Sequence, residues 1–285
     1  MAKVLIAGCG DIGSRLATNL VEIGHSVTAI RRQGTVFPKG VHGITGDLLT
    51  MALNNLPDAD IVFLIMTPQG RTAELYKEAY LLTAQKLVDR YQQDITCPKV
   101  LFVSSTSVYG QNSGEVLNEK EIALPKSATA KVLMQAETLL AEHLSATSVR
   151  FSGIYGPGRL RLIESIAKRE LWAVNQWTNR IHRDDCVGLL TFLAGLHTKG
   201  KALERVYIGT DCSPVSQWEV KLWLAKQLNT EPNLPEELGV KGFLPVSGKR
   251  LSNASVIEAG YQFLYPSYIL GYEALLEEYR ERCSA

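Results

Sequence analysis

The sequence KVLIAGCGDIG at residues 3–13 decides the fold of this protein. A short apolar run leads into three glycines with the spacing Gly-x-Gly-x-x-Gly, and a stretch of helical periodicity follows and ends before Gly24. Between a strand and a helix, such glycines allow a tight turn, close approach of the backbone to a pyrophosphate, and tight helix packing. The first free N–H groups of the helix face the phosphates. We therefore predict a dinucleotide site at Gly8, Gly10, Asp11, Ile12 and Gly13.

Short β-branched runs alternate with amphipathic stretches through the first two hundred residues, which is typical of a parallel sheet flanked by helices. The predicted strands cover residues 3–7, 26–30, 42–45, 61–66, 100–104 and 148–151. The predicted helices cover residues 12–23, 72–90, 129–143, 159–169, 216–228, 252–259 and 267–279, and residues 231–246 are expected to be irregular. The last three helices lie in the C-terminal part of the chain.

This pattern predicts an α/β protein with the Rossmann fold, a doubly wound parallel sheet flanked by helices. We expect residues 1–152 to form the dinucleotide-binding domain. Residues 153–285 are expected to form a small substrate lobe that is interleaved with the late elements of the sheet. Ligands should bind at the carboxyl ends of the strands.

The composition excludes several classes of partner. The formal net charge of the 285 residues is +1, which favours a small-molecule substrate over nucleic acid or an anionic membrane. No apolar run approaches the roughly 20 residues of a membrane-spanning helix. The N-terminus enters a strand without a leader-like stretch, which predicts a cytoplasmic protein. The five cysteines form no Cys-x-x-Cys pair, so we expect reduced thiols and no metal.

Two arginines indicate which dinucleotide binds. The second predicted strand ends at Ile30, where sites that prefer NAD carry an acidic residue, and here Arg31 and Arg32 follow. Two guanidinium groups suit a 2′-phosphate and favour NADP over NAD, although a solvated surface pair is the alternative. Asp47 could accept a hydrogen bond from the adenine amino group. We assign Arg31, Arg32, Asp47, Leu48, Met66 and Thr67 to the cofactor site.

Further motifs follow in order along the chain: SSTSVYG at 104–110, Arg150 with IYGPG at 154–158, IHRDD at 181–185 and VYIG at 206–209. With these motifs, the chain resembles the short-chain dehydrogenase/reductase superfamily in its extended branch of NAD(P)-dependent nucleotide-sugar epimerases and dehydratases. The resemblance implies that the Ser105 hydroxyl, or that of the adjacent Thr106, binds the reacting oxygen of the substrate. It also implies a nucleotide-sugar substrate and a homodimer formed through the helices at 72–90 and 129–143.

The family's acid/base is a tyrosine four residues before a lysine, and this chain lacks the pair. If Lys131 takes the place of the family lysine, Ser127 stands where the tyrosine belongs; a shifted register puts Thr129 and Leu133 in the two places instead. A serine hydroxyl cannot replace a phenol as proton donor without a nearby base. The chain thus resembles atypical members of the superfamily. Its Lys131 either contacts the cofactor or lies on the surface of its helix.

Two functions fit the sequence. The first is an NAD(P)-dependent oxidoreductase or an epimerase/dehydratase-like enzyme in which Ser105 orients the substrate. The second is a non-catalytic NADP-binding sensor or scaffold, and a relative that binds no nucleotide is a third, weaker option. We interpret Asp184 as a helix N-cap rather than a general base. Arg150 begins the segment that leads toward the substrate lobe, and the pair Lys249-Arg250 either binds an anionic group of the substrate or lies at the surface.

Overall fold

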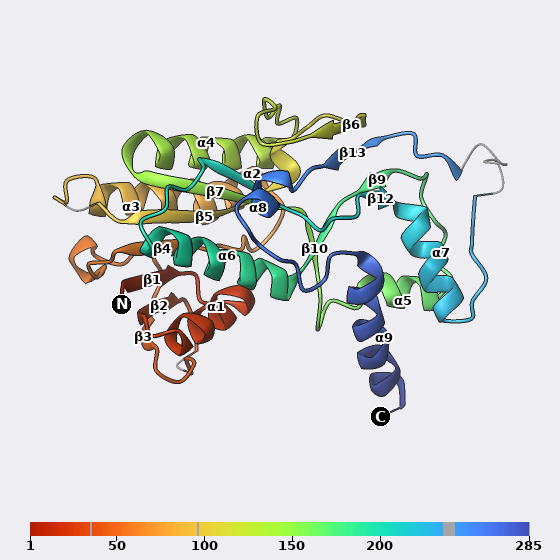
Figure 1. Ribbon diagram of the computed structural model, residues 1–285, viewed down its shortest axis with the longest axis horizontal. Helices are drawn as coiled ribbons and strands as arrows, with labels where there is room; N and C mark the ends of the chain where they lie inside the picture. The colour runs from red at the N-terminus through yellow and green to blue at the C-terminus, as the bar shows by residue number, and fades with distance from the viewer. Residues whose placement is uncertain (35, 96, 236–242, 285) are drawn as a thin grey trace. The chain divides into compact units, whose positions relative to one another are not determined.

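The protein is described here from a computed structural model that covers residues 1–34, 36–95, 97–235 and 243–284 (Figure 1). A seven-stranded sheet with the order β11-β7-β5-β4-β1-β2-β3 lies at its centre. Its strands are β1 (Lys3–Ala7), β2 (Ser26–Arg31), β3 (His42–Thr45), β4 (Ile61–Leu64), β5 (Lys99–Ser105), β7 (Ser145–Phe151) and β11 (Val206–Gly209). Neighbours from β3 to β5 run parallel, and the order reverses beside β1. The predicted α/β fold with a doubly wound sheet is confirmed.

Helices cover both faces of this sheet. Contacts place α1 (Asp11–Glu22) against β1 and β2, while α4 (Ala128–His143) lies against β5 and α3 (Thr83–Tyr91). Figure 1 shows α6 (Arg183–Thr198) on the same side as α1. Every residue of β4 is buried, as expected for a parallel strand covered on both faces. Beyond the end of α1, Gly24 has a φ of +91°, a left-handed conformation that glycine adopts readily.

The predicted helix over residues 72–90 is interrupted. It consists of α2 (Ala73–Tyr76), a π-helical turn η2 (Lys77–Leu82) and α3. The Thr83 hydroxyl donates to the carbonyl oxygens of Ala79 (2.6 Å) and Tyr80 (3.1 Å). Because this side chain competes with backbone donors for the same carbonyls, the turn widens locally.

Several short elements were not predicted. They are β6 (Ser113–Leu117) paired with β13 (Gly248–Leu251), β8 (Gly153–Tyr155) paired with β10 (Arg180–His182), and β9 (Trp177–Thr178) paired with β12 (Val215–Ser216). Most of these strands have only two to four residues, too few for a periodic pattern to stand out. The remaining elements are η1 (Leu53–Asn55), η3 (Thr106–Val108), α5 (Arg161–Ala167), α7 (Gln217–Gln227), α8 (Ala254–Glu258) and α9 (Tyr268–Ser284). Residues 236–242 of the stretch expected to be irregular lie outside the described residues.

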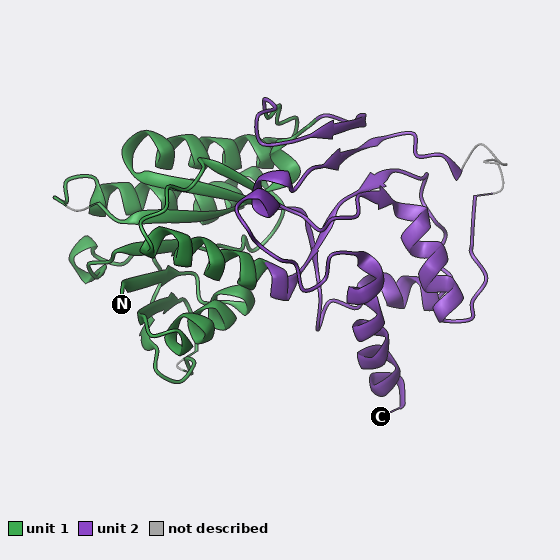
Figure 2. Ribbon diagram, in the orientation of Figure 1, with its two compact units in different colours: residues 1–110, 123–150, 186–207 green, residues 111–122, 151–185, 208–285 purple. Residues whose placement is uncertain are grey.

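By compactness the chain forms two units (Figure 2). Unit 1 holds residues 1–110, 123–150 and 186–207, and unit 2 holds residues 111–122, 151–185 and 208–285. The chain therefore passes between the units several times. The division at residues 152 and 153 stays a prediction about domains.

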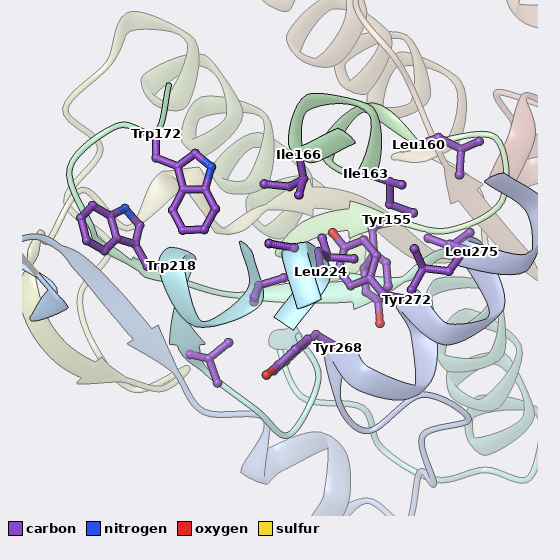
Figure 3. Close-up of a cluster of buried hydrophobic side chains, with 14 residues drawn as sticks. Tyr155, Leu160, Ile163, Ile166, Trp172, Trp218, Leu224, Tyr268, Tyr272 and Leu275 are labelled. Atoms are coloured by element: carbon purple, nitrogen blue, oxygen red, sulfur yellow. The ribbon is translucent and has the colours of Figure 1, made fainter. Parts of the chain in front are cut away.

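Unit 2 has its own hydrophobic core, which Figure 3 shows. Trp218 of α7 is buried there against Trp172 and donates its ring N–H to the Ala173 carbonyl oxygen at 2.8 Å. Trp223 packs at the edge of the same cluster, so both tryptophans of α7 belong to the core. The Ser216 hydroxyl caps α7 by accepting from the Glu219 amide at 3.1 Å, which confirms the predicted start of this helix.

In the described part of the chain, no helix has both the length and the apolar character needed to cross a bilayer. None of the five cysteines, all of which lie in the described residues, forms a disulfide bond.

Candidate functional site

A pocket of about 320 Å³ lies in unit 1, where β1, β2 and β4 end. Its lining comes from four loops that the sequence places at the carboxyl edge of the sheet. The lining residues are Gly8, Cys9, Gly10, Ile30, Arg31, Arg32, Gln33, Gly46, Leu48, Ile65, Met66, Thr67 and Gln69. This is the position at which doubly wound sheets bind their ligands.

The three glycines of the first turn have different roles. Gly8 has a φ of +107°, and a Cβ there would lie 1.9 Å from the Ile65 carbonyl oxygen. A Cβ on Gly13 would lie 2.3 Å from the Gly8 carbonyl oxygen, so this glycine lets α1 pack against the turn. A Cβ on Gly10 would meet no other described atom within 4 Å. Gly10 thus borders open space in the pocket, as the close approach of a pyrophosphate requires.

Other contacts hold this turn in place. The amides of Gly8 and Cys9 donate to the Ile30 carbonyl oxygen at 3.1 and 2.8 Å, which ties the turn to the end of β2. The N-cap of α1, Gly10, makes no side-chain capping bond, so the first amides of the helix are left for a ligand. Asp11 and Ile12, also predicted at this site, do not line the pocket. Both lie in the first turn of α1, where Asp11 is exposed and the Ile12 side chain is buried.

The two arginines after β2 are placed differently. The Arg31 guanidinium donates to the Val36 carbonyl oxygen at 3.0 Å and lies 5.8 Å from the centre of the Phe37 ring. It therefore shapes the loop after β2. Arg32 is exposed and lines both the main pocket and a smaller one beside it. Of the two, Arg32 is the side chain better placed for a ligand phosphate.

The loop after β3 closes the same region. The Asp47 carboxylate accepts from the Leu49 amide at 2.9 Å and lines the smaller pocket with Met66 and Thr67. Leu48 is buried and contributes an apolar wall to the main pocket. An apolar wall beside a carboxylate suits a base with an exocyclic amino group.

A buried ion pair lies beneath the end of β5. The Arg150 guanidinium donates to the Glu137 carboxylate at 2.6 Å and to the Tyr109 hydroxyl at 2.7 Å. The Ser104 hydroxyl, next to Ser105, donates to the same carboxylate at 2.5 Å. Arg150 is 5 % exposed, and its guanidinium is needed to neutralise Glu137. Sequence reasoning missed Glu137, although it falls on the apolar face of α4 with Ala130, Leu133 and Leu140.

Two acidic residues of unit 2 are structural. The helix α6 begins at Arg183, so Asp184 lies in its first turn and the predicted N-cap is wrong. The Asp184 carboxylate accepts from the Arg183 guanidinium at 3.1 Å. Asp185 accepts from the Tyr261 hydroxyl (2.9 Å) and from the Leu264 amide (2.8 Å). These partners explain both residues without a role as general base.

The basic pair of β13 is also partly explained by packing. The Arg250 guanidinium donates to the Gly114 carbonyl oxygen at 3.0 and 2.8 Å and lies 4.8 Å from the Trp177 ring centre. It therefore joins β13 to β6.

In the described residues, no group of three or more His, Cys, Asp or Glu side chains could hold a metal ion.

The free energy of unfolding should depend on pH through Asp211 of unit 2. Burial raises its pKa to about 7. Between the ordinary pKa of an aspartate and that value, the folded protein keeps a proton that the unfolded chain has lost. The free energy of unfolding therefore falls as pH rises, by up to about 1.4 kcal/mol per pH unit. The isosteric Asp211→Asn variant should lose this slope in urea unfolding at pH 5, 6 and 7; parallel profiles for both proteins would contradict it.

Comparison with known proteins decides the family. The model of the NAD-dependent epimerase/dehydratase family matches residues 4–209. The chain belongs to this family. It is 30% identical over 282 residues to the Escherichia coli K12 protein YeeZ, covering 93% of this chain and 97% of YeeZ.

Solved structures of similar proteins agree with this assignment. One from Methylobacillus flagellatus, provisionally described as an NAD-dependent epimerase/dehydratase, shares 36% identity with a TM-score of 0.82, covering 98% of this chain and 99% of that one. MoeE5, solved with UDP-glucose and NAD, shares 25% identity with a TM-score of 0.77 and 99% coverage of both chains.

The start of α4 holds the two residues that the sequence offers in place of the family tyrosine, Ser127 and Thr129. Ser127 is the N-cap: its hydroxyl accepts from the Ala130 amide at 3.1 Å and lies 3.0 Å from the Thr129 hydroxyl. Lys131 is exposed one turn into the helix. Ser105 caps η3 by accepting from the Ser107 amide at 3.2 Å, and Thr106 is buried beside it. Ser127 thus acts in capping.

Proposed function

We propose that this protein binds NADP in the pocket of unit 1 and uses it in an oxidoreductase or epimerase/dehydratase-like reaction on a small molecule. The observation that carries the proposal is the open space above Gly10 together with Arg32 in the lining of the same pocket. A pyrophosphate would lie over Gly10 at the start of α1, and the adenosine would lie against Leu48. NADP supplies or accepts a hydride when bound.

We expect the Arg32 guanidinium to bind the 2′-phosphate of NADPH. We expect Arg32→Ala to weaken NADPH binding about 10- to 100-fold, because a charge-assisted hydrogen bond contributes about 1.5–3 kcal/mol. NADH binding should change little. Arg31→Ala is the matched comparison: its guanidinium is held by Val36, so its loss should affect both dinucleotides alike. Calorimetric titration of both variants measures this, and equal losses of NADPH and NADH affinity in Arg32→Ala would contradict it.

On the reaction side, we assign Ser105 to the orientation of the substrate oxygen, with Thr106 as the alternative, and Lys131 to the nicotinamide ribose. The buried pair of Glu137 and Arg150 supports Ser105 indirectly, since it binds the neighbouring Ser104. Ser127 gives no substitute for the family tyrosine, because its oxygen already accepts a backbone hydrogen bond. Any proton transfer must therefore use another group or the substrate itself.

A nucleotide sugar is the proposed substrate class, since membership of the epimerase/dehydratase family and the likeness to MoeE5, which was solved with UDP-glucose, support it. The deciding experiment first titrates the purified protein with NADPH, NADH and their oxidised forms. It then follows nicotinamide absorbance and product formation with a panel of nucleotide sugars, with Ser105→Ala as the control. Turnover that Ser105→Ala loses, without a change in NADPH affinity, is the expected result.

The cytoplasmic location stays a prediction from the sequence.

A second candidate function is a non-catalytic NADP sensor or scaffold. The observation in its favour is the use of Ser127 as a helix cap where the family has its acid/base. In this case NADPH would bind tightly, no compound of the panel would be turned over, and Ser105→Ala would have no effect. Failure to bind any dinucleotide would contradict both functions.

We also propose that the protein forms a homodimer, as the family resemblance implies. A surface hollow between η2 and α4 in unit 1 is lined by Leu81, Leu82, Met134 and Leu139, and 39 % of Leu82 is exposed. Sedimentation should show a species of twice the chain mass that Leu82→Asp converts to monomer, because a carboxylate cannot be buried unpaired in an apolar interface. A monomeric wild-type protein would contradict this.

A further inference from the structure

A group of buried polar side chains lies within unit 2. The parallel pair of β8 and β10 sets Tyr155 beside His182, with 5.3 Å between ring centres. Arg180 lies two residues before His182 on the same face of the strand. From α9, Tyr272 stacks on Tyr155 at 4.8 Å, which Figure 3 also shows, and Tyr268 lies 5.7 Å from the Arg180 guanidinium carbon.

Asp211 belongs to the same group. Its amide donates to the Arg180 carbonyl oxygen at 2.8 Å, which places the two residues side by side. Burial raises the pKa of the Tyr155 hydroxyl; the charge of Asp211 raises it further, and that of Arg180 opposes the rise. Both charges therefore act on Tyr155 at short range.

One polar atom of each of these three side chains is left without a partner among the described residues: Tyr155 Oη, Arg180 Nη1 and Asp211 Oδ2. The residues are 5 %, 7 % and 1 % exposed. The other polar atoms of two of them are bonded, since Arg180 Nη2 donates to the Thr178 hydroxyl at 2.6 Å and Asp211 Oδ1 accepts from the Ser213 amide at 3.1 Å. Folded proteins rarely keep buried polar atoms unpaired, because each costs about 1–3 kcal/mol.

The chemistry of the three atoms defines what can pair with them. Arg180 Nη1 can only donate, Asp211 Oδ2 accepts when ionised and donates when protonated, and Tyr155 Oη can do either. Once Asp211 is ionised, a phosphate or carboxylate would meet its negative charge, and a cation would meet the Arg180 guanidinium. A hydroxyl oxygen can accept from Arg180, donate to Asp211 and bond to Tyr155 at the same time. The space around Tyr155 Oη is small, because a Cβ on Gly271 of α9 would lie only 2.0 Å from this oxygen.

We propose that Tyr155, Arg180 and Asp211 bind one neutral hydroxyl group, which belongs either to a water molecule or to an alcohol such as a sugar. The bound hydroxyl joins β8, β10 and the segment that follows β11. Buried waters typically make about three hydrogen bonds to polar groups of this kind. The proposal concerns unit 2 alone and does not depend on cofactor binding.

Crystal structures of the full chain, without ligand and soaked with UDP-glucose, test the proposal. We expect one oxygen within hydrogen-bond distance of Tyr155 Oη, Arg180 Nη1 and Asp211 Oδ2. A water present in both crystals identifies water as the source, and its replacement by a sugar hydroxyl identifies the alcohol. The proposal is overturned if the three atoms bond only to protein groups, or if an ion occupies the position.

A solution experiment gives an independent test. Tyr155→Phe and Asp211→Leu each remove one hydrogen-bonding partner at similar side-chain size, and their effects on Tm are compared with that of the double variant. If one hydroxyl bridges the two residues, the two Tm shifts should not add, because the first change already breaks the bridge. Additive shifts overturn the proposal. Tyr279→Phe, also on α9, combined with Asp211→Leu is the matched control that should be additive.

Discussion

Replacement of Gly10 by valine is expected to abolish dinucleotide binding and to lower the Tm of the protein only slightly. The two effects separate because a Cβ on Gly10 meets no described atom within 4 Å, so the added methyl groups fill only the space proposed for the pyrophosphate. The small loss of stability is expected because Gly10, with φ −89° and ψ −148°, is the N-cap of α1, where valine is less favourable than glycine. We expect the Kd for NADPH to rise at least about 100-fold, which corresponds to ~2.7 kcal/mol.

The neighbouring glycines provide the control for Gly10→Val. Gly13→Ala should lower the Tm, because its Cβ would lie 2.3 Å from the Gly8 carbonyl oxygen. Gly10→Ala should weaken binding less than Gly10→Val, because its side chain is smaller. Calorimetric titration and thermal unfolding measure both properties. Unchanged NADPH affinity in Gly10→Val would place the ligand elsewhere and would remove the basis of the proposed function.

Replacement of Glu137 by leucine should be among the most destabilising single changes in unit 1. It leaves the Arg150 guanidinium buried with only the Tyr109 hydroxyl and the Met134 sulfur as side-chain partners. Removal of one partner of a buried ion pair costs about 3–5 kcal/mol, because a charge stays in an apolar surrounding. We expect a loss of this size in the free energy of unfolding, measured in urea.

Two further variants show whether the charge is the cause. Glu137→Leu combined with Arg150→Met removes both charges and should recover most of the lost stability. Glu142→Leu, on the exposed side of the same helix, should change the free energy of unfolding by less than about 0.5 kcal/mol. If the double variant is as unstable as Glu137→Leu, the loss comes from packing rather than from the unpaired Arg150 charge.

Sequence reasoning reached the cofactor pocket because its main features are local. The glycines, Leu48, Met66 and Thr67 fall at the ends of predictable strands, and the structure brings them into one pocket or next to it. It could not separate Arg31 from Arg32, because their difference depends on which guanidinium the loop residues Val36 and Phe37 hold.

Other features depend on contacts that the sequence pattern does not reveal. In the sequence, Arg150 is a basic residue at the end of a predicted strand. Its ion pair with Glu137, thirteen residues earlier, shows that its side chain is buried. Asp184 reads as a helix cap, yet the helix begins one residue earlier. The π-helical turn at residues 77–82 depends on the Thr83 hydroxyl bonding two backbone carbonyls, which periodicity does not reveal.

The sequence by itself determined the α/β class, six of the seven strands of the doubly wound sheet and the glycine turn at residues 8–13, while β11 was not predicted. These follow from periodicity and turn chemistry, which act over a few neighbouring residues. Only the tertiary structure decided that Glu137 and Arg150 form a buried pair, that the Arg31 guanidinium donates to the Val36 carbonyl oxygen, and that Tyr155, Arg180 and Asp211 are buried in unit 2. Burial and pairing between segments far apart in the chain set the state of these side chains, and no local pattern encodes them.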